Sequence, residues 1–151
     1  MTGKKPVELL APHARANPTL DSAEAEAMFR KFMSGDFSYD EISNRPDSPA
    51  YASAEVLATI LPLMIDEMFA RDDMENFLIY PMLAAVDPEG EVRNWKAERT
   101  QELTKLVDHE AVEKILKLVA AARVDPPIPM DELDRIAVFW NSKLGSRASP
   151  A

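Results

Sequence analysis

Residues 53–69 have the sequence Ser-Ala-Glu-Val-Leu-Ala-Thr-Ile-Leu-Pro-Leu-Met-Ile-Asp-Glu-Met-Phe. Apolar residues recur there as neighbouring pairs four positions apart, which is the spacing of a helix face and differs from the alternation of a half-buried strand. We therefore predict a central buried helix over residues 54–69, with a bend or a break at Pro62 because proline removes one backbone hydrogen bond. The pairs are Val56/Leu57, Ile60/Leu61, Met64/Ile65 and Met68/Phe69.

Helical patterns continue on both sides of this segment. Asp21 and Glu24 have the spacing of a capping box, with Leu20 placed to fold back on the first turn, and Gly35 is suited to end that helix. The chain therefore predicts an all-α fold, a compact single-domain bundle of about six helices around residues 54–69. The remaining helices are predicted at about 38–43, from Ser48-Pro49 onward, at 91–107, from an Asp108 cap to about 123, and at 130–143.

The run from Phe77 to Val86 is compatible with two structures. Its β-branched and aromatic residues allow a buried strand. Asp72 with Glu75, however, has the spacing of a helix cap and its reciprocal acid, and the neighbouring segments are helical. We favour a buried helix bent at Pro81, while the choice between helix and strand for residues 76–86 stays open at this point.

Both ends of the chain lack strong periodicity. Residues 1–20 contain three prolines and predict a loosely ordered arm with one helical turn at about 7–10. The helical domain then covers 21–145, and 146–151 form a frayed tail. The first apolar run is too short for a signal peptide, and no apolar stretch approaches the roughly 20 residues that span a bilayer. With no cysteine in the chain, we expect a cytoplasmic protein.

The net charge of −9 is distributed unevenly. Residues 36–91 contain thirteen acids and two arginines, which gives −11 for that block, so the rest of the chain carries +2. Binding to DNA or RNA is disfavoured because phosphate contacts need clustered Lys and Arg. A basic protein partner would be attracted.

Reactive groups are sparse in this sequence. The run His109-Glu-Ala-Val-Glu113 has a glutamate where a helical zinc motif needs its second histidine. Adjacent acids such as Asp66/Glu67 and Asp72/Asp73 are common at helix ends. The four glycines stand apart, so no glycine-rich phosphate loop is present. We expect neither an enzyme nor a cofactor or metal site.

The leading hypothesis is a non-enzymatic protein-binding protein. In this hypothesis an acidic face engages a basic protein partner, as a toxin-neutralising immunity protein or another inhibitor would, and complementary charge accelerates the encounter. The alternative is that the acids only form a solvated surface that keeps the protein soluble. The candidate partner-binding residues are Asp36, Asp40, Glu41, Asp66, Asp72, Asp73 and Glu75.

Two further hypotheses belong to other classes. One is a regulatory or scaffold adaptor that associates through apolar patches, for instance as a homodimer, and whose binding depends weakly on salt. The other is a hydrolase or metal-dependent enzyme with an acidic site. That hypothesis requires a concave pocket in which Asp, Glu or His side chains converge.

Overall fold

The computed structural model describes residues 7–89 and 94–148. These residues form eight α-helices and one 3-10 helix, and their only β pairing is an isolated bridge between Leu10 and Ala52. The all-α fold predicted from the sequence is confirmed. The helices are α1 (Pro12–Ala16), α2 (Leu20–Met33), α3 (Tyr39–Ser43), η1 (Ser48–Tyr51), α4 (Ala54–Ala70), α5 (Ile79–Val86), α6 (Asn94–Leu106), α7 (His109–Ala122) and α8 (Met130–Ala148).

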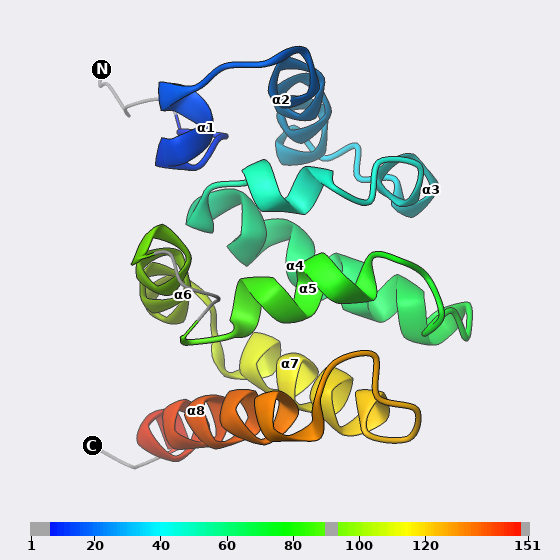
Figure 1. The fold of residues 1–151 in the computed structure, drawn as a ribbon, viewed down its shortest axis with the longest axis vertical. Coiled ribbons are helices and arrows are strands. Elements are labelled where there is room, and N and C mark those ends of the chain that lie inside the picture. Colours follow the sequence, from blue (N-terminus) through cyan, green and yellow to red (C-terminus); the bar gives the residue numbers. More distant parts are fainter. Residues whose placement is uncertain (1–6, 90–93, 149–151) are drawn as a thin grey trace.

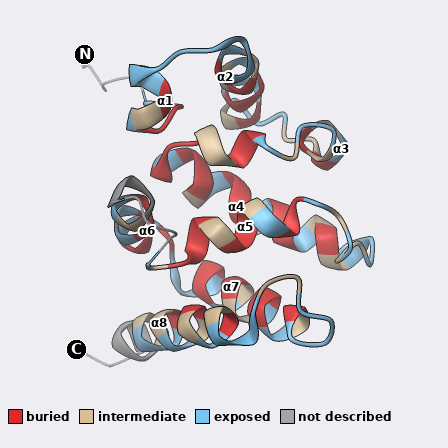
Figure 2. Ribbon diagram, viewed as in Figure 1, coloured by how far each residue is buried: buried red, intermediate tan, exposed pale blue. Residues whose placement is uncertain are grey.

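The helices are arranged in tiers along the long axis of the molecule (Figure 1). One end is formed by α1, α2 and α3, and the other by α7 and α8, which pack as an antiparallel pair. Between them lie α4 and α5, with α6 at one side. Contacts join α4 to α2, α6 and α7, and join α5 to α6 and η1. Buried residues line the facing sides of these helices (Figure 2). No helix in the described residues has the length and apolar character needed to cross a membrane.

The apolar pairs of residues 54–69 form the buried face of α4. Ser53 begins the helix, because its hydroxyl accepts a hydrogen bond from the Val56 amide at 3.2 Å. Every paired residue is buried except Phe69, which is partly exposed. The helix continues unbroken through Pro62, so the predicted possibility of a break is wrong. Buried residues on both sides of Pro62 hold the helix together despite the hydrogen bond that proline removes.

Some helices begin at the capping residue that the sequence predicts, and others begin elsewhere. Ser38 caps α3 and Asp108 caps α7, as predicted. The predicted Asp21–Glu24 box is wrong. Thr19 caps α2 with Ser22 as its reciprocal partner, and Leu20 is 77% exposed. Thr19 has the extended backbone that a capping residue requires, whereas Asp21 already lies in the first turn.

Residues 79–86 form a helix, α5, which settles the open choice against a strand. The predicted cap by Asp72 and Glu75 is wrong, because α5 begins only at Ile79. Pro81 therefore lies in the first turn, where its missing N–H leaves no helical hydrogen bond unmade. Asp72 instead follows the end of α4 with a positive φ of 51°.

The C-terminal helix is longer than predicted. α8 runs to Ala148, beyond the expected end near Lys143 and through Gly145. Residues 146–148 of the predicted frayed tail are therefore helical, and 149–151 lie outside the described residues. A single glycine costs a helix only about 1 kcal/mol, which an otherwise regular helix tolerates. The predicted helix over 91–107 appears as α6, and residues 91–93 lie outside the described residues.

Part of the N-terminal stretch is packed against the fold. Leu9, Leu10, Ala11 and Ala14 are buried. The Ala11 amide donates to the Tyr51 carbonyl at 2.8 Å, and a second bond joins residues 53 and 9. The helical turn predicted at 7–10 is wrong, because α1 begins at Pro12. Proline is suited to that first position because it has no N–H that would go unpaired there.

Candidate partner-binding groove

Three of the seven acids predicted to bind a partner form ion pairs within the chain. Two of the basic partners come from distant parts of the sequence and the third lies ten residues away, and each nitrogen lies within hydrogen-bond distance of the carboxylate. Each pair places a positive charge beside a carboxylate that is still partly or largely exposed, so these acids offer less net charge to another molecule than unpaired acids do. They are Asp40–Arg71 (2.6 Å), Glu41–Lys31 (2.6 Å) and Asp66–Lys114 (2.8 Å).

Asp73, a fourth predicted acid, anchors the connection between α4 and α5. Its carboxylate accepts hydrogen bonds from the Tyr39 hydroxyl at 2.9 Å and from the Asn76 amide at 2.8 Å. Asn76 also donates to the Ser43 hydroxyl at 3.1 Å and accepts from the Leu78 amide at 2.9 Å. These bonds attach residues 73–78 to α3. Asp73 therefore positions this connection.

Tyr39, which bonds to Asp73, is a buried residue. Burial of its ring, followed by the hydrogen bond to Asp73, raises the pKa of Tyr39 well above its ordinary value. The Arg71 guanidinium lies over the same ring at 4.9 Å from its centroid. Tyr39 thus contacts both the start and the middle of the α4–α5 connection, and its neutral hydroxyl remains a donor.

The other three predicted acids remain exposed, and no described base lies within ion-pair distance of them. Asp36 lies in the α2–α3 connection. Asp72 and Glu75 lie in the α4–α5 connection, where both line one groove. The structure therefore brings together only two of the seven predicted residues as unpaired acids at a common surface.

The groove lies between the α4–α5 connection and the α7–α8 connection, which are on the same side of the molecule in Figure 1. Its volume is about 810 Å³. That volume is within the range of about 300–1,000 Å³ that is typical of ligand pockets. Most of the residues that line it are apolar in type: Phe69, Met74, Phe77, Ile79, Tyr80, Ala121, Ala122, Val124, Pro126 and Pro127.

Several of these apolar side chains are unusually accessible. Val124 is 88% exposed, Phe77 is 72% exposed and Tyr80 is 48% exposed. The Phe77 and Tyr80 rings stack at 6.5 Å between centroids with an angle of 27°. Single exposed apolar residues are ordinary, but three that line the same groove form a patch of the kind found at interaction surfaces.

Three carboxylates and no Lys or Arg are among the residues that line the groove. They are Asp72, Glu75 and Asp125, and none forms an ion pair with a described residue. Asp125 is not among the predicted acids because it lies outside the acidic block of 36–91. The available signal was the proline-rich run 124–129, which cannot be helical and so holds its residues at a helix connection. One base is close by, since the Lys117 ammonium lies 4.5 Å from the centroid of the Phe69 ring.

Asp72 has a backbone conformation that glycine usually supplies. Its φ is 51°, and the amides of residues 72 and 73 donate to the carbonyls of Phe69 and Met68. This is the arrangement that commonly ends a helix with glycine in the left-handed conformation. Aspartate is among the few other residues that adopt it, at some cost in strain. A carboxylate is thus held on the groove edge where a glycine would be more stable.

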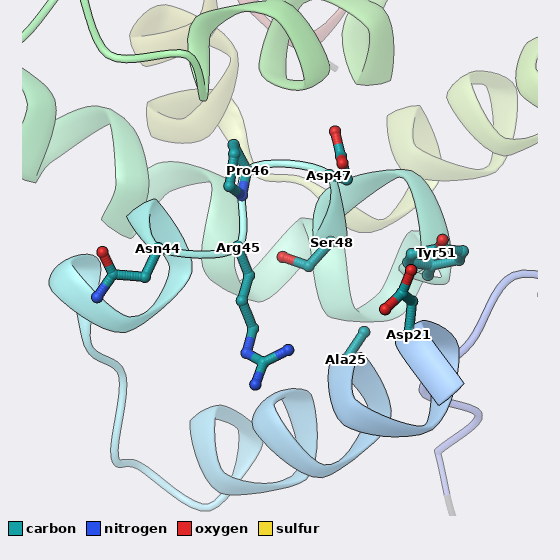
Figure 3. Close-up of a pocket in the computed structure, with 8 residues that line it drawn as sticks. All are labelled: Asp21, Ala25, Asn44, Arg45, Pro46, Asp47, Ser48 and Tyr51. Carbon is teal, nitrogen blue, oxygen red and sulfur yellow. The ribbon is translucent and has the colours of Figure 1, made fainter. Parts of the chain in front are cut away.

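A second hollow, of about 220 Å³, lies between α2 and η1 (Figure 3). It is lined by Asp21, Asn44, Arg45, Ser48 and Tyr51, among others. The Arg45 guanidinium is already paired with Glu24 at 3.1 Å. Ser48, predicted as a helix cap, is instead the first residue of η1, and its buried hydroxyl has no hydrogen-bond partner among the described residues. The hollow is too small to accept a protein segment.

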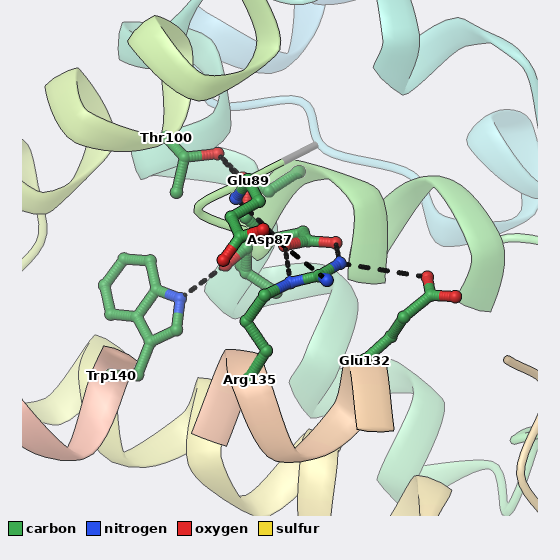
Figure 4. A network of polar contacts seen from close by, with 8 residues as sticks. Asp87, Glu89, Thr100, Glu132, Arg135 and Trp140 are labelled. Atoms are coloured by element: carbon green, nitrogen blue, oxygen red, sulfur yellow. Dashed lines mark hydrogen bonds and ion pairs between the residues drawn. The ribbon is translucent and has the colours of Figure 1, made fainter. Parts of the chain in front are cut away.

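A polar network joins α5, α6 and α8 (Figure 4). The nearly buried Asp87 carboxylate accepts two hydrogen bonds from Arg135, at 3.0 and 2.6 Å. The Asp87 carbonyl accepts from the Thr100 hydroxyl at 3.0 Å, and Trp140 Nε1 donates to the Val86 carbonyl at 2.7 Å. Because these groups satisfy one another, the network fixes the end of α5 against two helices.

Arg99 has a comparable structural role at η1. Its Nη1 donates to the carbonyls of Pro49, Ala50 and Ala52, at 3.1, 3.3 and 2.9 Å. Burial lowers the pKa of Arg99 to about 10, so it still carries its charge at neutral pH. A buried guanidinium therefore holds η1 and the residue that follows it against α6.

His109 and the adjacent acids form no metal-binding group in the described part of the chain. His109 begins α7 and lies 3.5 Å from Glu113, an ordinary contact between residues one helical turn apart. Across residues 7–89 and 94–148, no group of three His, Asp or Glu side chains is arranged to hold a metal ion.

Comparison of this chain with protein-family models, with curated proteins and with solved structures found no match.

Proposed function

We propose that this chain is a non-enzymatic protein-binding protein that engages a basic segment of a protein partner, acting in the cytoplasm. Toxin-neutralising immunity proteins and other inhibitors have this kind of role. In the proposal, the helices are organised around α4 as a central support, and the connections at one end of α4 and α7 make the contact. The observation that carries the proposal is the groove with three unpaired carboxylates and an exposed aromatic pair.

The charge of the whole chain supports the same proposal. The net charge is −9, and ion pairs remove only part of the acidic block from the accessible surface. A surface of one sign raises the rate of encounter with a partner of the opposite sign, and the rate falls as ionic strength rises. Carboxylates on an apolar groove add discrimination, because an acidic partner would bury like charges against them.

The adaptor hypothesis has one observation in its favour. Phe77, Tyr80 and Val124 expose apolar surface on a common groove, which an apolar partner or a second copy would cover. The two functions differ in their salt dependence. Association through apolar surface alone changes little between low and moderate salt, whereas charge-led association slows.

The test is an affinity capture from the native host followed by kinetics on the purified complex. We expect a basic partner whose association rate falls at least tenfold between about 20 and about 300 mM salt, with a smaller change in dissociation rate. An association rate that does not change over this range would rule out the charge-led function. It would favour the apolar adaptor instead.

A further inference from the structure

We infer that the groove between the α4–α5 and α7–α8 connections binds one peptide segment of the partner, in which lysine or arginine side chains flank apolar ones. This inference rests on the proposed function and adds the docking site and the chemistry of the occupant. It predicts that the apolar side chains fill the centre of the groove while the cations reach its edge.

The shape of the groove favours a short segment. A volume of about 810 Å³ accommodates a few side chains and is too large for a single ion to fill. Both walls are held before binding: Asp73 and Asn76 attach one to α3, and three prolines stiffen the other. Because little ordering is needed when the partner binds, such a groove loses less entropy than two flexible loops would.

The charge on the groove edge selects the sign of the partner. Asp72, Glu75 and Asp125 come from both walls, so a segment lying between them meets carboxylates on either side. None of the three is neutralised by a described base. Paired Asp40, Glu41 and Asp66 lack this property, which makes them a matched control of equal charge.

The aromatic residues favour a cation that lies beside apolar groups. Lys117 already lies 4.5 Å from the centroid of Phe69, so one ring of the groove accepts an ammonium within the chain. The stacked Phe77 and Tyr80 rings are exposed and offer further faces to a partner cation or to an apolar side chain. A guanidinium or ammonium over such a ring is attracted by its negative face.

The conformation of Asp72 determines how its charge can be removed in a test. Its positive φ would be better served by glycine, yet the position carries a carboxylate that makes no described ion pair. Asparagine adopts the same conformation and has nearly the same shape, so Asp72→Asn removes the charge without disturbing the turn.

The test uses fluorescence anisotropy with the full chain and a labelled peptide carrying three arginines interleaved with two leucines and a tryptophan. One comparison peptide has citrulline in place of arginine, and another has serine in place of the apolar residues. Titrations are run at about 50 and about 300 mM salt. Circular dichroism melts confirm that each variant is folded.

Four variants separate the contributions. The charge variant of the groove is Asp72→Asn with Glu75→Gln and Asp125→Asn, and its control is Asp40→Asn with Glu41→Gln and Asp66→Asn. The apolar variant is Phe77→Ser with Tyr80→Ser. Its control is Leu20→Ser with Val138→Ser, two residues that are exposed and do not line the groove.

We expect both groove variants to weaken binding of the arginine–leucine peptide at least tenfold, with less than a threefold change in either control. Both comparison peptides should bind more weakly than the first. Equal binding by wild type and groove variants, with strong salt dependence, would overturn the groove and leave the charge-led function standing. If the affinity were the same at both salt concentrations and the citrulline peptide bound as tightly as the arginine peptide, the charge-led function would be overturned as well. No binding of the arginine–leucine peptide to the wild type would also overturn the inference.

Discussion

At position 72 the backbone conformation favours glycine, whereas the residue present is an aspartate. Its φ of 51° favours glycine, and Gly35, which ends α2 with a φ of 109°, is the corresponding case where glycine is present. At Gly35 an added Cβ would meet no atom within 4 Å, so only the backbone conformation restricts that position. Substitutions at these two positions can therefore show how much a left-handed backbone conformation changes the free energy of unfolding.

Replacing Asp72 with glycine should stabilise the protein by about 0.5 kcal/mol. The strain that is relieved, about 1–2 kcal/mol, exceeds the extra chain entropy that glycine loses on folding, about 0.5–1 kcal/mol. Gly35→Ala should destabilise by about 1 kcal/mol, for the opposite reason. Urea denaturation measures both. A destabilised Asp72→Gly variant would show that the carboxylate supports the fold.

The hydroxyl of Tyr39 should make stability fall in alkaline solution. Its pKa is raised in the folded state, so above pH 10 the native chain keeps a proton that the unfolded chain releases. The unfolded state then binds fewer protons, and the free energy of unfolding decreases as pH rises. This contribution is complete below pH 10. The free energy of unfolding of Tyr39→Phe, measured by urea titration, should decrease less between pH 9 and pH 11 than that of the wild type. An identical decrease in the two proteins would contradict this prediction.

Helix boundaries in this chain follow from local side chains in some places and from distant contacts in others. Ser38 and Asp108 cap α3 and α7 through bonds to residues three positions on, which sequence spacing can predict. The Asp72–Glu75 pair has the same spacing, yet its segment is held to α3 through Asp73 and Asn76. Those bonds join residues 34 and 33 positions apart, and no local pattern predicts them.

The N-terminal segment should be part of the cooperative fold. Leu10 is 7% exposed, so Leu10→Ala should reduce the free energy of unfolding by about 2–3 kcal/mol through lost burial and the cavity that remains. Val7→Ala, three residues earlier and 47% exposed, should change it by less than about 0.5 kcal/mol. Similar small effects for both substitutions would indicate that this segment does not contribute to the core.

The contact of α8 with the end of α5 should depend on Arg135. Arg135→Met leaves the Asp87 carboxylate, 9% exposed, without its bidentate partner and should cost about 2 kcal/mol. The control is Arg123→Met, which breaks a pair with Asp134 whose side chains are 42% and 55% exposed and should cost less than about 1 kcal/mol. Thermal melts of the two variants give the comparison. Equal shifts would mean that the buried network contributes no more than a surface pair.

At the scale of the whole molecule, ion pairing decides how much of the acidic block is available. The sequence gives the net charge of the acidic block, −11, but it does not show which Lys and Arg side chains pair with its acids. Asp40 meets Arg71 and Asp66 meets Lys114, at separations of 31 and 48 residues. Only the folded chain shows that Asp72 and Glu75 form no ion pair with a described residue and line the same groove as Asp125. Sequence therefore predicts the sign of the surface and two of the groove's acids, while tertiary packing determines the site.

Net charge and the apolar groove should act together on solubility. The net charge approaches zero near the pI of 4.7, where repulsion between molecules is lost. We expect light scattering to show the strongest self-association near that pH, and we expect Phe77→Ser with Tyr80→Ser to reduce it. Leu20→Ser with Val138→Ser serves as the control. If all three chains associate equally, the groove makes no special contribution to self-contact.

The α7–α8 connection contains three prolines within six residues and supports no helix of its own. Residues 124–127 form one groove wall, while the core beneath is built from other segments. Amino acids in this short bridge can therefore be exchanged with little penalty to folding. Under the proposed function, other sequences placed at residues 124–127 would change which partner the groove accepts while the packing of the helices is kept.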